Sequence, residues 1–169
     1  MSPLMAYFWP SVAAGLVVGA IALTIIFRRR LSGLRKWLVV DVAILTAVLL
    51  SLVWSGPLGG GRKFIDSVEP AARKTLDYYE MTQVTARLGQ APLTRELILE
   101  GRADDFQRSE LVRVMGQLPG VSGATWKGGN AAWPIILEGA LMAIAGLLLG
   151  ALLAYLFEAH RRYNAQWSW

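Results

Sequence analysis

The chain contains no cysteine and a single histidine, His160, among its 169 residues. The lack of cysteine excludes disulfides and gives no signal about the redox compartment. A lone histidine just beyond an apolar stretch and beside arginines is typical of an interfacial polar residue rather than of a haem or pigment ligand. No G-x-S-x-G motif is present either. These absences predict a protein that is not an enzyme and has no cofactor or metal of its own.

Charge is nearly absent from three long apolar stretches. They run from about residue 4 to 27, from 37 to 54 and from 131 to 157. A helix that rises about 1.5 Å per residue crosses the hydrocarbon core of a membrane with about 20 apolar residues. We therefore expect a transmembrane hairpin within residues 1–54, and a third transmembrane helix followed by a cytoplasmic tail within residues 131–169.

Basic residues cluster in two short segments beside these stretches. Five lie between the first two stretches and two closely follow the third: Arg28, Arg29, Arg30, Arg35 and Lys36, then Arg161 and Arg162. Lys and Arg beside span ends are retained in the cytoplasm. We expect the N-terminus and residues 55–130 in the periplasm of a bacterial inner membrane, and the C-terminus in the cytoplasm. Residues 55–130 are nearly neutral, so the net charge of +5 reflects topology and does not predict nucleic-acid binding.

Small residues repeat along two of the stretches at the spacing of one helix face. They are Gly15 and Gly19 in the first stretch, and Gly139, Ala143, Gly146, Gly150 and Ala154 in the third. Such a face lets another helix backbone approach closely, which is how helices associate in lipid. We expect these faces to be packing faces, whether they meet each other or another subunit.

Aromatic residues mark the ends of the stretches: Trp9, Trp37, Trp54, Trp133 and Tyr155. Their amphipathic rings favour the headgroup level, so they predict an aromatic belt at the membrane interface. Trp167 and Trp169 lie beyond the third stretch. We expect them either to fold back onto the membrane surface or to insert into a partner.

Asp41 and Glu138 are the only charged residues well within the apolar stretches. An acid in a membrane span costs about 2.5–3.5 kcal/mol at the centre and is a functional candidate by default. Their positions are near opposite membrane faces, so we do not expect a proton relay within one molecule. Two interpretations stay open: interfacial acids with basic or partner groups close by, or part of a transporter.

Residues 55–130 are long enough to fold as a small domain after a glycine-rich hinge at residues 56–61. The apolar patterns predict four elements in order: a helix at 70–88, a strand at 93–101, a helix after Asp104, and a strand at 121–126. Asp104 and Gln107 have the spacing of a capping box. We expect an extracytoplasmic α+β domain with one sheet backed by helices.

Part of this domain resembles a BON domain. The features that carry the resemblance are a strand ending in Glu100-Gly101, an amphipathic helix, and the run Leu118-Pro119-Gly120-Val121 before a final strand. The resemblance covers about residues 82–126. BON domains usually have two strands before the second helix, where one is expected here. The resemblance implies an envelope module that binds phospholipid or other proteins and has no catalytic residues.

These observations predict a non-enzymatic accessory or scaffold subunit of a larger bacterial inner-membrane complex, of the photosynthetic, respiratory or secretion type. Its expected partners are the membrane, other integral membrane subunits, and lipids or pigments that the host complex contributes. The alternative is a stand-alone envelope-maintenance protein whose BON-like domain binds phospholipid.

Overall fold

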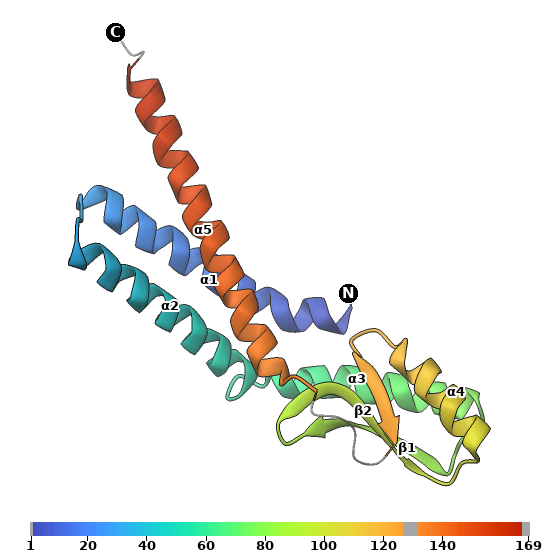
Figure 1. The fold of residues 1–169 in the computed structure, drawn as a ribbon. Helices are drawn as coiled ribbons and strands as arrows, with labels where there is room; N and C mark the ends of the chain where they lie inside the picture. The colour runs from blue at the N-terminus through green and yellow to red at the C-terminus, as the bar shows by residue number, and fades with distance from the viewer. Residues whose placement is uncertain (1, 127–131, 167–169) are drawn as a thin grey trace. The chain divides into compact units, whose positions relative to one another are not determined.

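The computed structural model describes residues 2–126 and 132–166 (Figure 1). In order, its elements are α1 (Pro3–Arg28), α2 (Leu34–Ser55), α3 (Gly60–Tyr78), β1 (Val84–Gln90), β2 (Leu93–Gly101), α4 (Asp105–Gly116), β3 (Gly123–Trp126) and α5 (Ile135–Gln166). They form two compact units. We call Met1–Tyr7 with Gly56–Glu138 the small domain, and Phe8–Ser55 with Gly139–Trp169 the helical unit.

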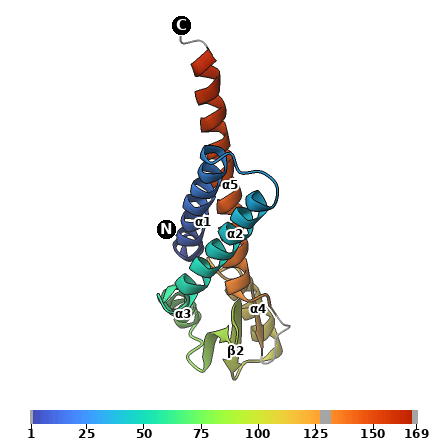
Figure 2. The same cartoon turned by 90° about the vertical axis from the view of Figure 1, so that its left-hand side faces the viewer.

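Three helices, α1, α2 and α5, are long and apolar enough to cross a membrane, which confirms the expected number. α1 and α2 form a hairpin joined by a short turn (Figures 1 and 2). α5 differs from the expected span at both ends, because it begins at Ile135 and continues past residue 157 to Gln166. At about 1.5 Å per residue it is about 48 Å long, which exceeds the hydrocarbon core of about 30 Å.

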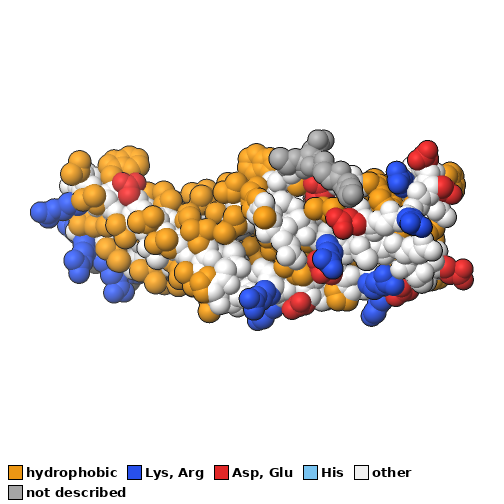
Figure 3. All heavy atoms as spheres, turned by 90° about the horizontal axis from the view of Figure 1, so that it is seen from below, with side chains coloured by type: hydrophobic (Ala, Val, Ile, Leu, Met, Phe, Trp, Pro, Cys, Tyr) orange, Lys and Arg blue, Asp and Glu red, His pale blue; other side chains and the backbone are white. Residues whose placement is uncertain are grey.

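The helical unit is held together by small side chains. On α2 the buried residues are Ala43, Ala47 and Ser51, which recur every fourth position and so form one stripe. The two alanines pack with Ala143 and Leu147 of α5. The buried Ser51 hydroxyl lies 3.2 Å from that of Ser11 on α1, within hydrogen-bonding distance. Large apolar side chains gather on the outside of the long helices, while charges of both signs spread over the small domain (Figure 3).

The first helix of the small domain, α3, begins earlier than expected. The glycine-rich segment at 56–61 was expected to lack regular structure, but α3 starts at Gly60. The physical reason is an apolar stripe at every fourth residue, Phe64, Val68, Ala72 and Leu76, which buries one helix face. Gly59 precedes the helix in a left-handed conformation, with φ of 75°.

α3 also ends earlier than expected, so the predicted helix at 70–88 is wrong beyond Tyr78. Glu80 adopts a left-handed conformation with φ of 58°. The Glu80 amide donates to the carbonyl of Asp77, and the Met81 amide donates to that of Leu76. This is a Schellman motif, which ends a helix and usually has glycine where Glu80 stands.

The three strands form one sheet in the order β1-β2-β3. β1 pairs antiparallel with β2, and β3 pairs parallel with β2 after the α4 crossover. β2 has the predicted bounds, and β3 lies within its predicted range. The capping box of α4 is confirmed, since the Gln107 amide donates to the Asp104 carboxylate and the Asp104 amide donates to the Gln107 side chain. The order is therefore helix–strand–strand–helix–strand, with one strand more than expected.

α3 packs against β1 and α4 against β3. The domain core consists of apolar residues from helices and alternate strand positions: Phe64, Leu76, Val84, Leu88, Leu97, Leu99, Leu111 and Met115. Because side chains alternate along a strand, the intervening residues of β1 and β2 lie on the opposite face of the sheet.

Candidate interaction surfaces

The small-residue faces of α1 and α5 meet each other in the helical unit. A Cβ atom built on Gly15 would lie 2.9 Å from the carbonyl carbon of Ala143 and closer still to its oxygen. A Cβ atom on Gly19 would lie 2.8 Å from the carbonyl carbon of Leu147. Real Cβ contacts are essentially never shorter than 3.0 Å. Only glycine therefore fits these two positions of α1 at the observed separation.

The contact is reciprocal. A Cβ atom on Gly150 would lie 2.8 Å from the carbonyl carbon of Leu16, and one on Gly146 would lie 3.0 Å from that of Val12. Of the other predicted packing residues, Gly139 and Ala143 are buried and Ala154 is half-buried. We call this contact the glycine seam: Gly15 and Gly19 on α1 with Gly146 and Gly150 on α5.

The outer face of α2 has a different character. We define it as Trp37, Leu38, Asp41, Val42 and Leu45, all of which are exposed. The exposed fraction is 64% for Trp37, 61% for Val42 and 60% for Leu45. Asp41 lies about 160° around the helix axis from the buried Ala43, so it points away from the stripe that packs on α1 and α5. Within residues 2–126 and 132–164, no side chain forms an ion pair with Asp41.

Glu138 has an ion-pair partner. It lies in the first turn of α5, where its carboxylate accepts a hydrogen bond of 2.8 Å from Arg95 of β2. The two side chains are 26% and 21% exposed, so the ion pair is mostly shielded from solvent. Arg95 also donates through Nε to the carbonyl of Gly120, 3.1 Å away. One guanidinium therefore joins three segments of the small domain: β2, the turn before β3 and the start of α5.

Other contacts tie the start of α5 into the same domain. Ile135 is fully buried, and Pro134 forms a β-bridge with Thr94 of β2. At the other end of the domain sequence, the ring of Tyr7 packs against Phe64 with 5.7 Å between centroids. The small domain therefore includes residues from two helices that were expected to be membrane spans.

Arg95 was not among the predicted site residues, although the sequence contains a signal for it. Strand alternation places Arg95 on the same face of β2 as the buried Leu97 and Leu99. A charged residue in a core-facing position needs a partner of opposite charge. Glu138, an acid within an apolar stretch, was the complementary signal.

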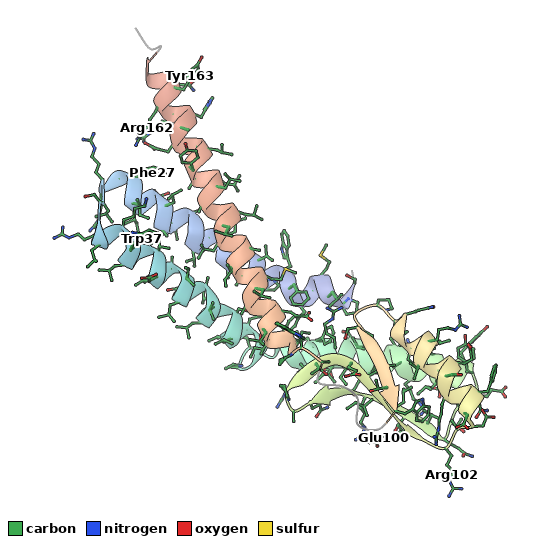
Figure 4. The ribbon with its side chains drawn as sticks, viewed as in Figure 1. Phe27, Trp37, Glu100, Arg102, Arg162 and Tyr163 are labelled. Atoms are coloured by element: carbon green, nitrogen blue, oxygen red, sulfur yellow. The ribbon has the colours of Figure 1, made fainter. Side chains whose placement is uncertain are left out.

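The basic clusters gather at one end of the helical unit. The guanidinium of Arg162 lies 5.6 Å from the ring of Phe27, the residue before Arg28 (Figure 4). The same Arg162 pairs with Glu158 at 3.0 Å. His160 contacts Asn164, with 3.0 Å between the side-chain nitrogens. The α1–α2 turn and the last turns of α5 therefore bring their positive charges to the same end.

The predicted interface aromatics are mostly exposed. Trp9, Trp37, Trp133 and Tyr155 are exposed, whereas Trp54 is half-buried. Trp167, Trp169 and residues 127–130 of the expected extracytoplasmic domain lie outside the described residues.

The sheet face opposite α3 and α4 borders a hollow of about 770 Å³. Its wall is mainly apolar, with one acid, and comes from the strands and the start of α5: Thr94, Glu96, Ile98, Trp133, Pro134 and Leu137. A smaller hollow of about 360 Å³ lies beside α4, next to Arg113. A hydrogen bond to Glu110 raises the pKa of Arg113, which is already fully charged at neutral pH.

No group of three or more potential metal ligands occurs among the described residues. No protein family, curated protein or solved structure matches this chain.

Proposed function

We propose that this protein is an accessory or scaffold subunit of a larger bacterial inner-membrane complex, and that it presents its small domain to the periplasm. The observation that carries the proposal is the outer face of α2, where Asp41 stands among exposed apolar side chains without a partner in the described chain. An acid that faces lipid tails is disfavoured by up to about 2.5–3.5 kcal/mol. A neighbouring subunit with a basic or hydrogen-bonding side chain beside Asp41 removes that penalty, whereas lipid tails do not.

The arrangement of positive charge supports the orientation. Both basic clusters lie at one end of the helical unit, and Lys and Arg beside span ends favour the cytoplasm. The small domain follows α2 and precedes α5, so with three spans it lies on the opposite side, in the periplasm.

Labelling of single cysteines tests this orientation, because the chain has no native cysteine. Ser32 in the α1–α2 turn and Ser109 on α4 are both exposed, and serine to cysteine is a conservative change. We expect a membrane-impermeant thiol reagent to label Ser109→Cys, but not Ser32→Cys, in intact spheroplasts. Permeabilised cells are the control in which both react. Labelling of Ser32→Cys alone in intact cells would invert the topology.

Purification in a mild detergent tests the subunit assignment. We expect the full chain to co-purify with other integral membrane proteins in fixed stoichiometry, and any pigment or redox centre in the sample would identify the type of host complex. An 18.5 kDa chain that elutes alone under several mild detergents would contradict the proposal.

Phospholipid binding by the small domain is the second candidate. The order of elements favours it, because two strands precede the second helix, as in BON domains. The hollow beside Ile98 and Trp133 offers an apolar surface on the sheet face opposite α3 and α4.

Co-flotation provides the test. The full chain would be held in phosphatidylcholine nanodiscs and mixed with phosphatidylglycerol vesicles, with empty discs as control. We expect loaded discs to float with the vesicles, and an Ile98→Asp variant to float less. Loaded discs that stay with the empty discs would remove this candidate.

A further inference from the structure

The helix that carries Asp41 provides no basic neighbour for its carboxylate. On a helix surface, the neighbours of a residue lie three and four positions away. For Asp41 these positions hold Trp37, Leu38, Ile44 and Leu45, none of which is basic. The nearest basic residues in sequence, Arg35 and Lys36, lie six and five positions before it and therefore off this neighbourhood.

The described residues of the other helices do not supply a partner either. The stripe of α2 that contacts α1 and α5 consists of Ala43, Ala47 and Ser51. Asp41 points to the opposite side, with Val42 and Leu45 exposed beside it. Whatever satisfies this carboxylate comes from outside the described part of the chain.

We compare three candidates for what covers this face of α2: lipid tails, a second copy of the chain, and a helix of another protein. Lipid tails offer no hydrogen-bond donor. A second copy packed through the same face in a parallel dimer would bring two Asp41 carboxylates together, which is repulsive. A helix from another protein with a lysine or arginine at the matching depth provides the opposite charge and covers the apolar residues.

We infer that the outer face of α2 binds a transmembrane helix of a different protein, through an ion pair between Asp41 and a lysine or arginine of that helix. The matching depth is about 10 Å from Leu34, the first residue of α2. Leu38, Leu45 and Leu52 repeat every seven residues on this side and are all exposed. One charged position within such an apolar seam fixes the register and selects the partner. The inference rests on the proposed function, since it describes how the subunit joins its complex.

A designed helix tests the binding chemistry without knowledge of the natural partner. The probe is an oligo-leucine transmembrane peptide with one lysine two turns from its cytoplasmic-side end, and the matched peptide has leucine there. The full chain carries a donor dye on Ser32→Cys and the peptide an acceptor at the corresponding end. Both are reconstituted in phosphatidylcholine vesicles, which contain no primary amine, and energy transfer reports association.

We expect the lysine peptide to associate about tenfold more tightly than the leucine peptide with the wild-type sequence at position 41. Asp41→Asn should remove this preference, and Asp41→Glu should retain it. Equal association of the two peptides, or a preference that survives Asp41→Asn, would overturn the inference. Transfer between two labelled copies of the chain that is blocked by substitution of Leu45 would identify the face as a homodimer interface and also overturn it.

Repeating the experiment with phosphatidylethanolamine separates a lipid amine from a protein partner. Loss of the lysine preference in that lipid alone would show that headgroup amines occupy the site, against the inference. In native membranes, Asp41→Asn should release the co-purifying proteins while Asp41→Glu keeps them. If the complex survives Asp41→Asn, the inference fails and the proposed function stands. If the wild-type chain already purifies alone, the proposed function fails.

Discussion

The glycine seam between α1 and α5 leads to the most specific prediction. We consider Gly15→Ala and Gly150→Ala, one from each helix. In both cases the added methyl group would meet a backbone carbonyl of the facing helix closer than any real Cβ contact. A backbone atom cannot rotate away as a side chain does. The two helices must therefore separate, and the neighbouring contacts along the seam must weaken with them.

Two opposing effects set the magnitude. Overpacking of a close contact typically costs about 1–3 kcal/mol. Replacing glycine by alanine within a helix returns up to about 1 kcal/mol through helix propensity. Because the clash is with backbone, the overpacking cost should lie in the upper part of its range, which leaves a net loss in the free energy of unfolding of about 1–2 kcal/mol for each variant. The double variant should lose less than the sum, because the first methyl group has already moved the helices apart.

Unfolding of the full chain in mixed micelles, with increasing sodium dodecyl sulfate and helicity as the signal, measures these effects. Val17→Ala is the matched control, since Val17 lies between the two glycines of α1 but is 54% exposed. It should change stability by no more than about 0.5 kcal/mol. If both glycine variants behave like Val17→Ala, the close approach of α1 and α5 does not exist in the folded protein.

The remaining predictions concern the small domain, and thermal unfolding followed by circular dichroism measures all of them. Arg95→Ala should lower stability by about 1–3 kcal/mol, because it leaves the shielded Glu138 carboxylate unpaired; Glu138→Gln, which can still accept the hydrogen bond, should cost less, and the reverse order would contradict the assignment. Asp104→Ala should cost about 1 kcal/mol through loss of the N-cap, whereas Asp104→Asn should be nearly neutral. Gly101→Ala should cost at least about 1–3 kcal/mol, because φ is 141° and the new Cβ would meet the backbone of Gln83; Gly123→Ala, where a Cβ meets nothing within 4 Å, is its control.

Local sequence signals predicted part of the fold correctly. The number of long apolar helices, the bounds of β2 and the capping box of α4 all depend on residues within a few positions of one another. Asp104 and Gln107 are three positions apart, and both of their hydrogen bonds lie within that one turn. Such features are readable because their partners lie in the same short segment.

The ends of α3 were mispredicted because the deciding residues break the usual associations. Gly60 and Gly61 are buried in the first turn of the helix, although glycine runs usually mark loops. Glu80 ends the helix in a left-handed conformation that glycine normally adopts. Without a glycine stop, the apolar residues Val84 and Leu88 extended the predicted helix into what is β1.

The candidate surfaces depend on contacts between distant segments, which periodicity does not reveal. The small-residue faces were readable on each helix, but not that Gly15 faces Ala143, which is far along the chain. Arg95 and Glu138 lie 43 residues apart, and their pairing follows from the sheet and from the start of α5. Asp41 is different, because the sequence places Arg35 and Lys36 near it along the chain, yet no described residue forms an ion pair with it.

The boundary of the small domain determines how its function can be tested. A fragment of residues 55–130 would contain the whole sheet, but it would lack the buried Tyr7 and Ile135. It would also expose Arg95, whose carboxylate partner lies at Glu138. Removing a fully buried apolar side chain of this size costs about 2–5 kcal/mol, and domain stability is only about 5–15 kcal/mol. Loss of lipid or protein binding by that fragment would therefore report unfolding as much as function, which is why the full chain in a membrane is the sample that separates the two.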